Sequence, residues 1–267
     1  TLTGSDADKE TVRASSGITG LPGGGGGDYI VTTTTISASE LISLDSQYET
    51  VIASAVTTIT GTAADINTVY TAGSAGTITG LGNEAVTLSD TTIAVSSLNT
   101  LDAYTTGVVN AATVTIITGT AAEIIHLFIG PGLVGIIGLG NENITVTGTI
   151  TVAQFNTIAA STTGVITATV TEGDMATLAG ITESGHALTV TVTDALVAAS
   201  DLNTLDGRTT VAVDAATVTA LTGKTAELNT AYTAYAAGTI IGLGNEAVII
   251  SDTTIDAALL ITLDAHT

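Results

Sequence analysis

The chain of 267 residues contains no cysteine, which excludes disulfide bonds, thiolate catalysis and cysteine-ligated metals. Aromatic residues are scarce at 3%, with no tryptophan and two phenylalanines. A core of this composition relies on Val, Ile, Leu, Ala and the methyl groups of Thr, and such small side chains suit thin, regular layers. Proline occurs only twice, whereas the 30 glycines are typical of a chain with many tight turns.

Basic residues are also rare, since 4 Lys and Arg stand against 25 Asp and Glu, a formal net charge of −21. A surface this acidic repels phosphate backbones and anionic lipids, so we expect neither nucleic-acid nor membrane-surface binding. The acidic charge suits divalent cations, and it also keeps an apolar, Thr-rich chain in solution. Both interpretations stay open. No unbroken apolar run reaches the ~18 residues of a membrane span.

Two motifs recur along the chain and alternate with each other. Motif A begins at Ile36 (ISASELISLD) and returns at Ile93 (IAVSSLNTLD), a shift of 93 − 36 = 57 residues. Motif B begins at Gly61 (GTAADINTVY) and has a degenerate copy at Gly4 (GSDADKETVR). Further copies of motif A begin at Ile150, Val197 and Ile255, and further copies of motif B at Gly119 and Gly223. Tandem repetition at this period indicates an array of similar units, each burying its apolar face against its neighbours.

Both motifs predict short helices. In motif B, Thr62 and Asp65 have the spacing of a capping box, apolar residues follow at helical intervals, and Gly73 is expected to end the helix. In motif A, Leu98 and Leu101 lie three residues apart, and every other copy has an apolar pair at these positions. A degenerate helix is predicted at Glu172–Ile181, and another near residue 10.

Alternating or β-branched runs precede these helices and predict strands. Threonines on the alternate strand face are expected to form hydroxyl ladders between neighbouring strands. The predicted strands are Val56–Thr60, Ala85–Leu88, Thr113–Thr118, Ile144–Thr147, Ile166–Thr171, Leu188–Thr193, Thr217–Leu221 and Val248–Ile250.

The predicted fold is an α/β repeat solenoid of about ten coils, each a short parallel β-strand plus a short helix. Two coils make one unit of about 57 residues, and residues 1–267 form a single array. An all-β solenoid, with motif A as a corner, is the alternative, but the capping pattern and the Leu spacing favour α/β. We expect the sequence to be a fragment or protomer of a longer array.

A Leu-Gly-Asn-Glu turn occurs three times and provides the candidate ligands of a metal ion. Asn and Glu oxygens in a loop are ligands that Ca²⁺ prefers, whereas the structural interpretation is a Gly-Asn turn that leads into the next strand. Beyond this possible Ca²⁺, the sequence predicts no cofactor. The candidate ligands are Asn83, Glu84, Asn141, Glu142, Asn245 and Glu246.

Four motif-A copies end in an aspartate. Because A and B coils alternate, successive copies of this residue are expected two coils apart, on the order of 10 Å, which is too far for direct chelation. We therefore expect solvated helix-end residues. They are Asp45, Asp102, Asp206 and Asp264.

Catalytic constellations are absent from the sequence. His126, His186 and His266 have no metal-ligand spacing, and neither a nucleophile elbow nor a phosphate-binding loop occurs. We therefore expect no enzymatic activity.

The sequences of the repeats resemble those of a known class of proteins. Leu98–Asp102 (LNTLD) followed by Thr105–Gly107 (TTG), and Ile78–Ile93 (ITGLGNEAVTLSDTTI), are similar to the giant Thr-rich tandem-repeat proteins of bacterial cell surfaces. The likeness is greatest to those of marine cyanobacteria, including the type related to swimming. This resemblance implies export, an extracellular or cell-surface location, and a structural, adhesive or motility role without catalytic residues.

The function expected from the sequence is an extracellular structural repeat protein that forms a fibre, sheath or surface layer. Its partner would be further copies of itself, through end-to-end or lateral association, and a surface polysaccharide is a second possible partner. The alternative is a Ca²⁺-dependent adhesin stalk or glycan-binding surface module.

Overall fold

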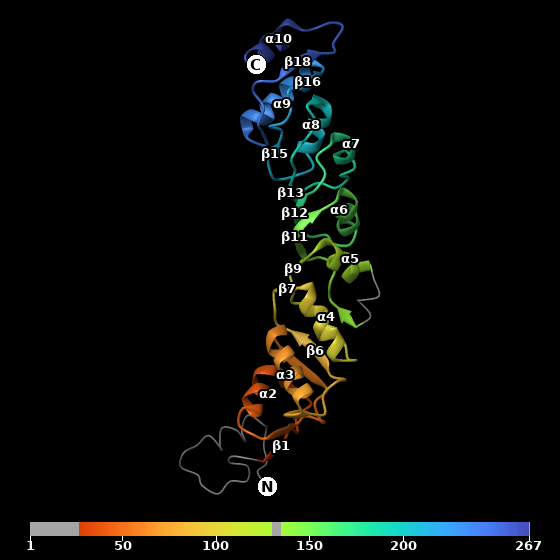
Figure 1. Ribbon diagram of the computed structural model, residues 1–267, viewed down its shortest axis with the longest axis vertical. Coiled ribbons are helices and arrows are strands. Elements are labelled where there is room, and N and C mark those ends of the chain that lie inside the picture. Colours follow the sequence, from red (N-terminus) through yellow and green to blue (C-terminus); the bar gives the residue numbers. More distant parts are fainter. Residues whose placement is uncertain (1–26, 130–134, 267) are drawn as a thin grey trace. The chain divides into compact units, whose positions relative to one another are not determined.

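The computed structural model describes residues 27–129 and 135–266. Within these ranges the protein is a mixed α/β structure with parallel strands, in which short helices α2–α10 alternate with short strands β1–β18 (Figure 1). The degenerate motif-B copy at Gly4, and the helix expected near residue 10, lie outside the described residues. The chain divides into two compact units, one of Thr1–Ile117 with Ile129–Gly140 and the other of Thr118–Phe128 with Asn141–Thr267.

The first unit contains two parallel sheets, ordered β1-β3-β5 and β10-β8-β6-β4-β2. Neighbouring strands in each sheet come from successive parts of the chain, as in the pairs Thr35 with Thr58 and Thr58 with Ala85. The elements are β1 Asp28–Ile30, β2 Thr35–Ser37, α2 Ala38–Asp45, β3 Thr50–Ile52, β4 Thr58–Gly61, α3 Ala63–Ala75, β5 Ile78–Thr79, β6 Ala85–Leu88, β7 Thr92–Ala94, α4 Val95–Tyr104, β8 Val109–Asn110 and β10 Ile136–Ile137. Strand β9 (Ile116–Gly119) lies at the division between the units.

The second unit pairs its strands in the same parallel manner, in the orders β11-β12-β13, β14-β16-β18 and β15-β17. Figure 1 shows α6 and α7 on one side of β11–β13. The elements are α5 Ala121–Ile129, β11 Asn143–Ile150, α6 Val152–Ala159, β12 Ile166–Val170, α7 Met175–Leu178, β13 Ala187–Thr189, β14 Leu196–Ala198, α8 Ala199–Asp206, β15 Val213–Asp214, β16 Ala220–Gly223, α9 Thr225–Ala237, β17 Ile240–Ile241, β18 Ala247–Ile250 and α10 Ala257–Asp264.

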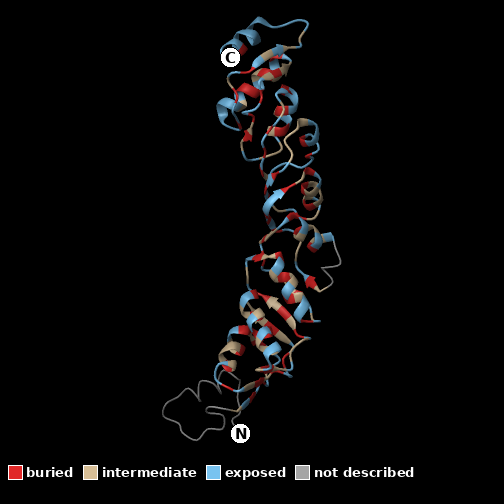
Figure 2. Ribbon diagram, in the orientation of Figure 1, coloured by how far each residue is buried: buried red, intermediate tan, exposed pale blue. Residues whose placement is uncertain are grey.

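Every described copy of motifs A and B forms a helix, as predicted. The apolar pair of motif A lies in the core, with Leu98 and Leu101 fully buried in α4, and Ile66 and Val69 of motif B are equally buried in α3. Buried positions recur in the helices and in the strands beside them (Figure 2). Burying such apolar stripes against neighbouring elements stabilises helices that are too short to persist alone.

Three local predictions were wrong. Helix α3 continues past Gly73 and ends at Gly76, whose φ of 86° is the left-handed conformation that favours glycine. The helix predicted at Glu172–Ile181 is only Met175–Leu178. More strands form than the one expected for each coil, because strands of two or three residues, such as Thr35–Ser37, are too short to show a period of two.

Many of the described threonine hydroxyls donate to backbone carbonyl oxygens, and the hydroxyl ladders stay a prediction. On the strand side, the Thr57 hydroxyl donates to the Thr34 carbonyl at 3.1 Å. In the helices, Thr68 donates to the carbonyl four residues earlier, Ala64, at 3.0 Å. The many threonines therefore satisfy backbone acceptors while their methyl groups remain available for packing.

Candidate functional site

The Leu81–Glu84 turn joins β5 to β6 and is held by backbone contacts that only glycine allows. Gly80 has a φ of 85°, and a Cβ atom there would lie 2.8 Å from the Ser54 backbone nitrogen. Gly242 repeats this arrangement in the second unit, where a Cβ would lie 2.5 Å from the Ala216 nitrogen. The glycines therefore permit a close approach between one turn and the next.

The glutamate of this turn is directed inward. Glu84 is 0% exposed, and the Gly82 N–H donates to both of its carboxylate oxygens, at 3.1 and 2.9 Å. The Tyr70 hydroxyl, from the last turn of motif B, adds a third hydrogen bond of 3.2 Å. A buried carboxylate is tolerated only when such donors replace the water it has lost.

The same cluster recurs in the second unit. Glu246 is 9% exposed and accepts from the Gly244 N–H at 2.8 and 2.9 Å and from the Tyr232 hydroxyl at 3.2 Å. The copy at Glu142 is also buried, but motif B has Phe128 in place of the tyrosine there and cannot supply a hydroxyl. Two of the three turns therefore share a complete set of glycine and tyrosine donors.

A threonine after motif A secures the backbone of the same glutamate. The Thr105 hydroxyl donates to the Glu84 carbonyl at 2.6 Å and accepts from the Gly107 N–H at 3.0 Å. Thr162 makes the same two bonds, to the Glu142 carbonyl and from Gly164, at the same distances. The Thr-x-Gly sequence after motif A is thus a specific contact between successive repeats, which sequence reasoning missed.

Burial raises the pKa of both tyrosines. Loss of solvent raises the pKa of Tyr232 to about 12, and the negative charge and hydrogen bond of Glu246 act in the same direction. Burial likewise raises the pKa of Tyr70 well above its usual value, opposed by the Thr105 hydrogen bond and supported by the Glu84 charge. Both phenols are hydrogen-bond donors at neutral pH, as tyrosine is at its ordinary pKa, and burial extends this to higher pH.

The asparagine and the glutamate of each candidate calcium turn differ in exposure. Asn83, Asn141 and Asn245 are exposed, whereas the adjacent glutamates are buried. Among the residues that the structure describes, no group of three or more His, Asp or Glu side chains is arranged to hold a metal ion. The calcium hypothesis remains a prediction. In the structure, Glu84 and Glu246 accept hydrogen bonds from glycine N–H groups and tyrosine hydroxyls of the protein.

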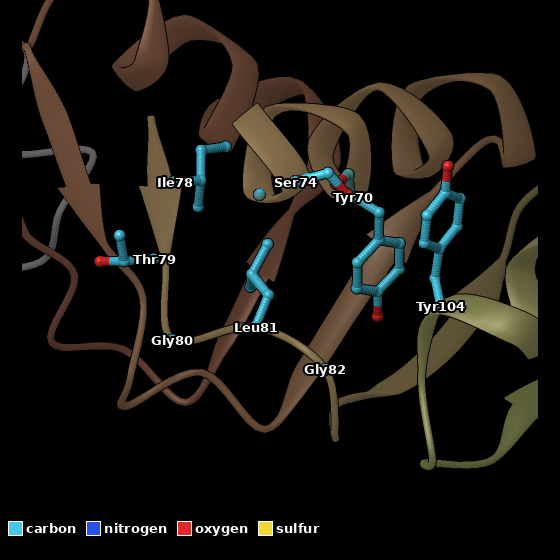
Figure 3. Close-up of a pocket in the computed structure, with 9 residues that line it drawn as sticks. Tyr70, Ser74, Ile78, Thr79, Gly80, Leu81, Gly82 and Tyr104 are labelled. Atoms are coloured by element: carbon cyan, nitrogen blue, oxygen red, sulfur yellow. The ribbon is translucent and has the colours of Figure 1, made fainter. Parts of the chain in front are cut away.

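A pocket of about 360 Å³ lies beside the first of these turns. Figure 3 shows Tyr70 and Tyr104 next to each other at one side of it, with Leu81 and Ile78 at the other. The two rings are stacked, with centroids 5.3 Å apart and planes inclined by 13°. Tyr104 is 36% exposed, so the pocket has an aromatic surface that solvent can reach.

A second group of acidic residues stabilises helix N-termini in the preceding repeat. Asp90 accepts from the Ala63 N–H at the start of α3 at 2.8 Å, and Asp252 accepts from the Thr225 N–H and hydroxyl at the start of α9 at 2.6 and 2.7 Å. These bonds lower the pKa of Asp252.

Two other carboxylates accept from helix N-termini in the same way. Glu172 accepts from the Val152 N–H of α6, and Asp194 accepts from the Met175 N–H of α7. Each carboxylate complements the positive end of a helix dipole.

The aspartates at the end of motif A were expected to be solvated, and only Asp264 is exposed. Asp206 is half-buried and accepts from the Thr239 hydroxyl at 3.1 Å. The Oδ1 atom of Asp45 is buried without a hydrogen-bond partner. The expectation was therefore wrong for Asp206, which contacts a threonine 33 residues further along the chain, and Asp45 and Asp102 are also half-buried.

The histidines have separate structural surroundings. The Nδ1 atom of His186 accepts from the Ile166 N–H at 3.1 Å, and burial lowers the pKa of this side chain against the opposing charge of Glu183. His266 stacks on Tyr232 with centroids 5.8 Å apart, the place that Tyr104 takes beside Tyr70. His126 is exposed.

Comparison with known proteins gave no relative: no family model, no curated protein and no solved structure matches this chain. No helix in the described ranges is long and apolar enough to cross a membrane.

Proposed function

We propose that this chain is an extracellular structural repeat protein whose strand–helix coils stack as a solenoid and assemble into a fibre, sheath or surface layer. In this account the chain carries force and occupies space, and it performs no catalysis. The repeats have threonine-rich sequences similar to those of giant bacterial surface proteins, and this resemblance supports an extracellular location.

The observation that carries this proposal is that the acidic side chains bond to turns and helix N-termini of the protein itself. Glu84 and Glu246 hold turns, while Asp90 and Asp252 cap the helix of the preceding repeat. Side chains that would bind a substrate or ion in an enzyme are here directed to contacts that recur from one repeat to the next. Such recurrence is typical of arrays in which stability is a sum of neighbour contacts.

A glycan-binding surface module is a second candidate, and the pocket beside Tyr104 favours it. Exposed aromatic rings provide the apolar face on which neutral sugars stack, and the chain has few other such rings. A calcium-dependent adhesin would need, in addition, a cation site involving the exposed asparagines of the turns.

Electron microscopy of the purified protein, in calcium and in a chelator, tests the proposal. Ordered assemblies in both solutions are the expected result, because packing and internal hydrogen bonds hold the repeats. Assemblies that dissolve in chelator would favour the calcium-dependent adhesin. Isolated, unassembled molecules under all conditions would contradict a fibre or layer.

A further inference from the structure

The pocket beside the Leu81–Glu84 turn has a counterpart in the second unit that a side chain fills. Residues 70–104 and 232–266 are aligned copies of one sequence, shifted by 244 − 82 = 162 at the turn and by 235 − 73 = 162 in the preceding helix. At this helix position the first unit has Gly73, in α3, and the second has Tyr235, in α9. The two units therefore differ by one aromatic ring at the same place.

The Tyr235 ring covers the turn of the second unit. A Cβ atom placed on Gly244 would lie 3.5 Å from the Tyr235 hydroxyl oxygen and 3.7 Å from its Cε1 atom, and Leu243 is 4% exposed. In the first unit, a Cβ atom on Gly82 would meet no described atom within 4 Å outside its own chain neighbours, and Leu81 is half-buried. The first turn is therefore partly uncovered where the second is covered by a ring.

The uncovered space is the pocket of about 360 Å³, a volume within the range of small-ligand sites. Figure 3 shows Leu81 between Ile78 and the stacked rings of Tyr70 and Tyr104. Apolar side chains and tyrosine rings of this kind favour a further aromatic ring, which gains both burial and ring–ring contact.

Two polar groups that line the pocket are already hydrogen-bonded within the protein. The Ser74 hydroxyl donates to the Tyr70 carbonyl at 3.0 Å, and the Gly82 N–H donates to the Glu84 carboxylate. A sugar carries several hydroxyl groups, and each costs free energy when it is buried without a partner. A flat ring with one hydroxyl group makes smaller demands, so the lining favours an aromatic ligand over a sugar.

We propose that this pocket binds one neutral aromatic ring of the size of phenol, in the place that the Tyr235 ring takes in the second unit. The hydroxyl of the ligand is directed towards Gly82 and the opposite end of its ring towards Gly73, because the Tyr235 hydroxyl is the atom nearest to the position above Gly244. Aromatic acids are disfavoured, since the chain has a net charge of −21. Such a site needs only one copy of the chain and is independent of the assembly proposed above.

Titration of the isotope-labelled full chain with p-cresol, the side-chain analogue of tyrosine, tests the proposal by NMR. Saturable shifts of the Gly73 and Gly82 backbone amides are expected, with a dissociation constant on the order of 1 mM for so small a ligand. N-acetyl-tyrosinamide distinguishes the source of the ring: saturable shifts with it extend the site to tyrosine side chains of a partner polypeptide, and their absence assigns the site to free aromatic molecules. Methyl glucoside should give no saturable shift at either glycine.

Variants at the two aligned positions exchange the pocket between the units. In Gly73→Tyr the added Cβ would lie 3.3 Å from the Leu81 Cδ1 atom, the end of a flexible side chain, so the new ring can be accommodated. This variant should weaken p-cresol binding at Gly82 about tenfold or more, whereas Gly73→Ala, which adds no ring, should change it by less than about threefold. Tyr235→Ala uncovers the second turn and should add saturable shifts at Gly244.

Three results would overturn the proposal. They are the lack of saturable p-cresol shifts at Gly73 and Gly82, an equal loss of binding in Gly73→Tyr and Gly73→Ala, and saturable shifts with methyl glucoside in place of p-cresol, which would favour the glycan-binding module. If Gly73→Tyr does not fold, Tyr235→Ala decides: a folded variant that gains no p-cresol site at Gly244 contradicts the match between ring and pocket. Fibres or layers seen by microscopy are unaffected by any of these results, so the structural role is tested separately.

Discussion

The hydroxyl of Tyr70 donates a hydrogen bond of 3.2 Å to the carboxylate of Glu84, and both side chains are buried. Tyr232 and Glu246 repeat this bond in the second unit at the same distance. The tyrosine lies in the second half of the long helix, α3 or α9, and the glutamate immediately precedes β6 or β18, so the bond joins each long helix to the start of that strand.

Replacing Tyr70 with phenylalanine should destabilise the first unit by about 1–3 kcal/mol, because the buried carboxylate loses one of its donors. Urea unfolding measures the change. Tyr235→Phe is the matched control, since that ring is 40% exposed, and its stability should change by less than about 0.5 kcal/mol. Equal changes in the free energy of unfolding for the two substitutions would show that the Tyr70 hydrogen bond does not contribute to stability.

Gly107→Ala should be destabilising by about 1–3 kcal/mol, because the new methyl group would collide with the Glu84 carbonyl. Gly207→Ala provides the comparison: the nearest atom to its added Cβ lies 3.5 Å away, and its φ is −68°. We expect Gly207→Ala to be neutral or slightly stabilising, since alanine restricts the unfolded chain. Thermal unfolding of both variants measures the difference.

Acid should weaken the helix caps. The Thr225 N–H and hydroxyl lower the pKa of Asp252 in the folded chain below its usual value of 3.8. A lowered folded-state pKa stabilises the fold above the unfolded-state value, and this stability is lost as the pH falls through the folded-state pKa.

Asp252→Asn should therefore reduce the pH dependence of the melting temperature below about pH 4, the region set by the reference pKa of Asp. Glu123 and Asp174, whose pKa values are lowered by Thr120 and Thr177, should retain part of it. Asp264→Asn removes an exposed carboxylate and controls for net charge. Identical pH profiles for Asp252→Asn and the unmodified chain would contradict the role given to this cap.

Helices were predictable from this sequence to a much greater extent than strands. The three-residue spacing of Leu98 and Leu101 and the pairing of Thr62 with Asp65 are local signals, and both appear as expected in α4 and α3. Two-residue strands such as Ile78–Thr79 depend on pairing with a distant segment, so no local pattern predicts them. The end of α3 was misplaced because Gly73 and Gly76 are equally plausible stops in sequence.

The environment of Glu84 could not be read from its turn. An Asn-Glu pair beside two glycines has the composition of an exposed loop, and the donors that meet the Glu84 carboxylate, the Gly82 N–H and the Tyr70 hydroxyl, are brought to it only by folding. A signal was present in the repeats themselves: a tyrosine precedes the glutamate by 14 residues in two copies, and phenylalanine replaces it in the third.

The most direct test of the central claim, that the Glu84 carboxylate holds its turn to the preceding helix and does not bind an ion, is thermal unfolding in calcium and in chelator. The unmodified chain, Glu84→Ala and the exposed-site variant Asn83→Ala would be compared. We predict that Glu84→Ala lowers the melting temperature equally in both solutions and that Asn83→Ala leaves it unchanged. A calcium-induced rise in the unmodified chain that both substitutions abolish would contradict the account.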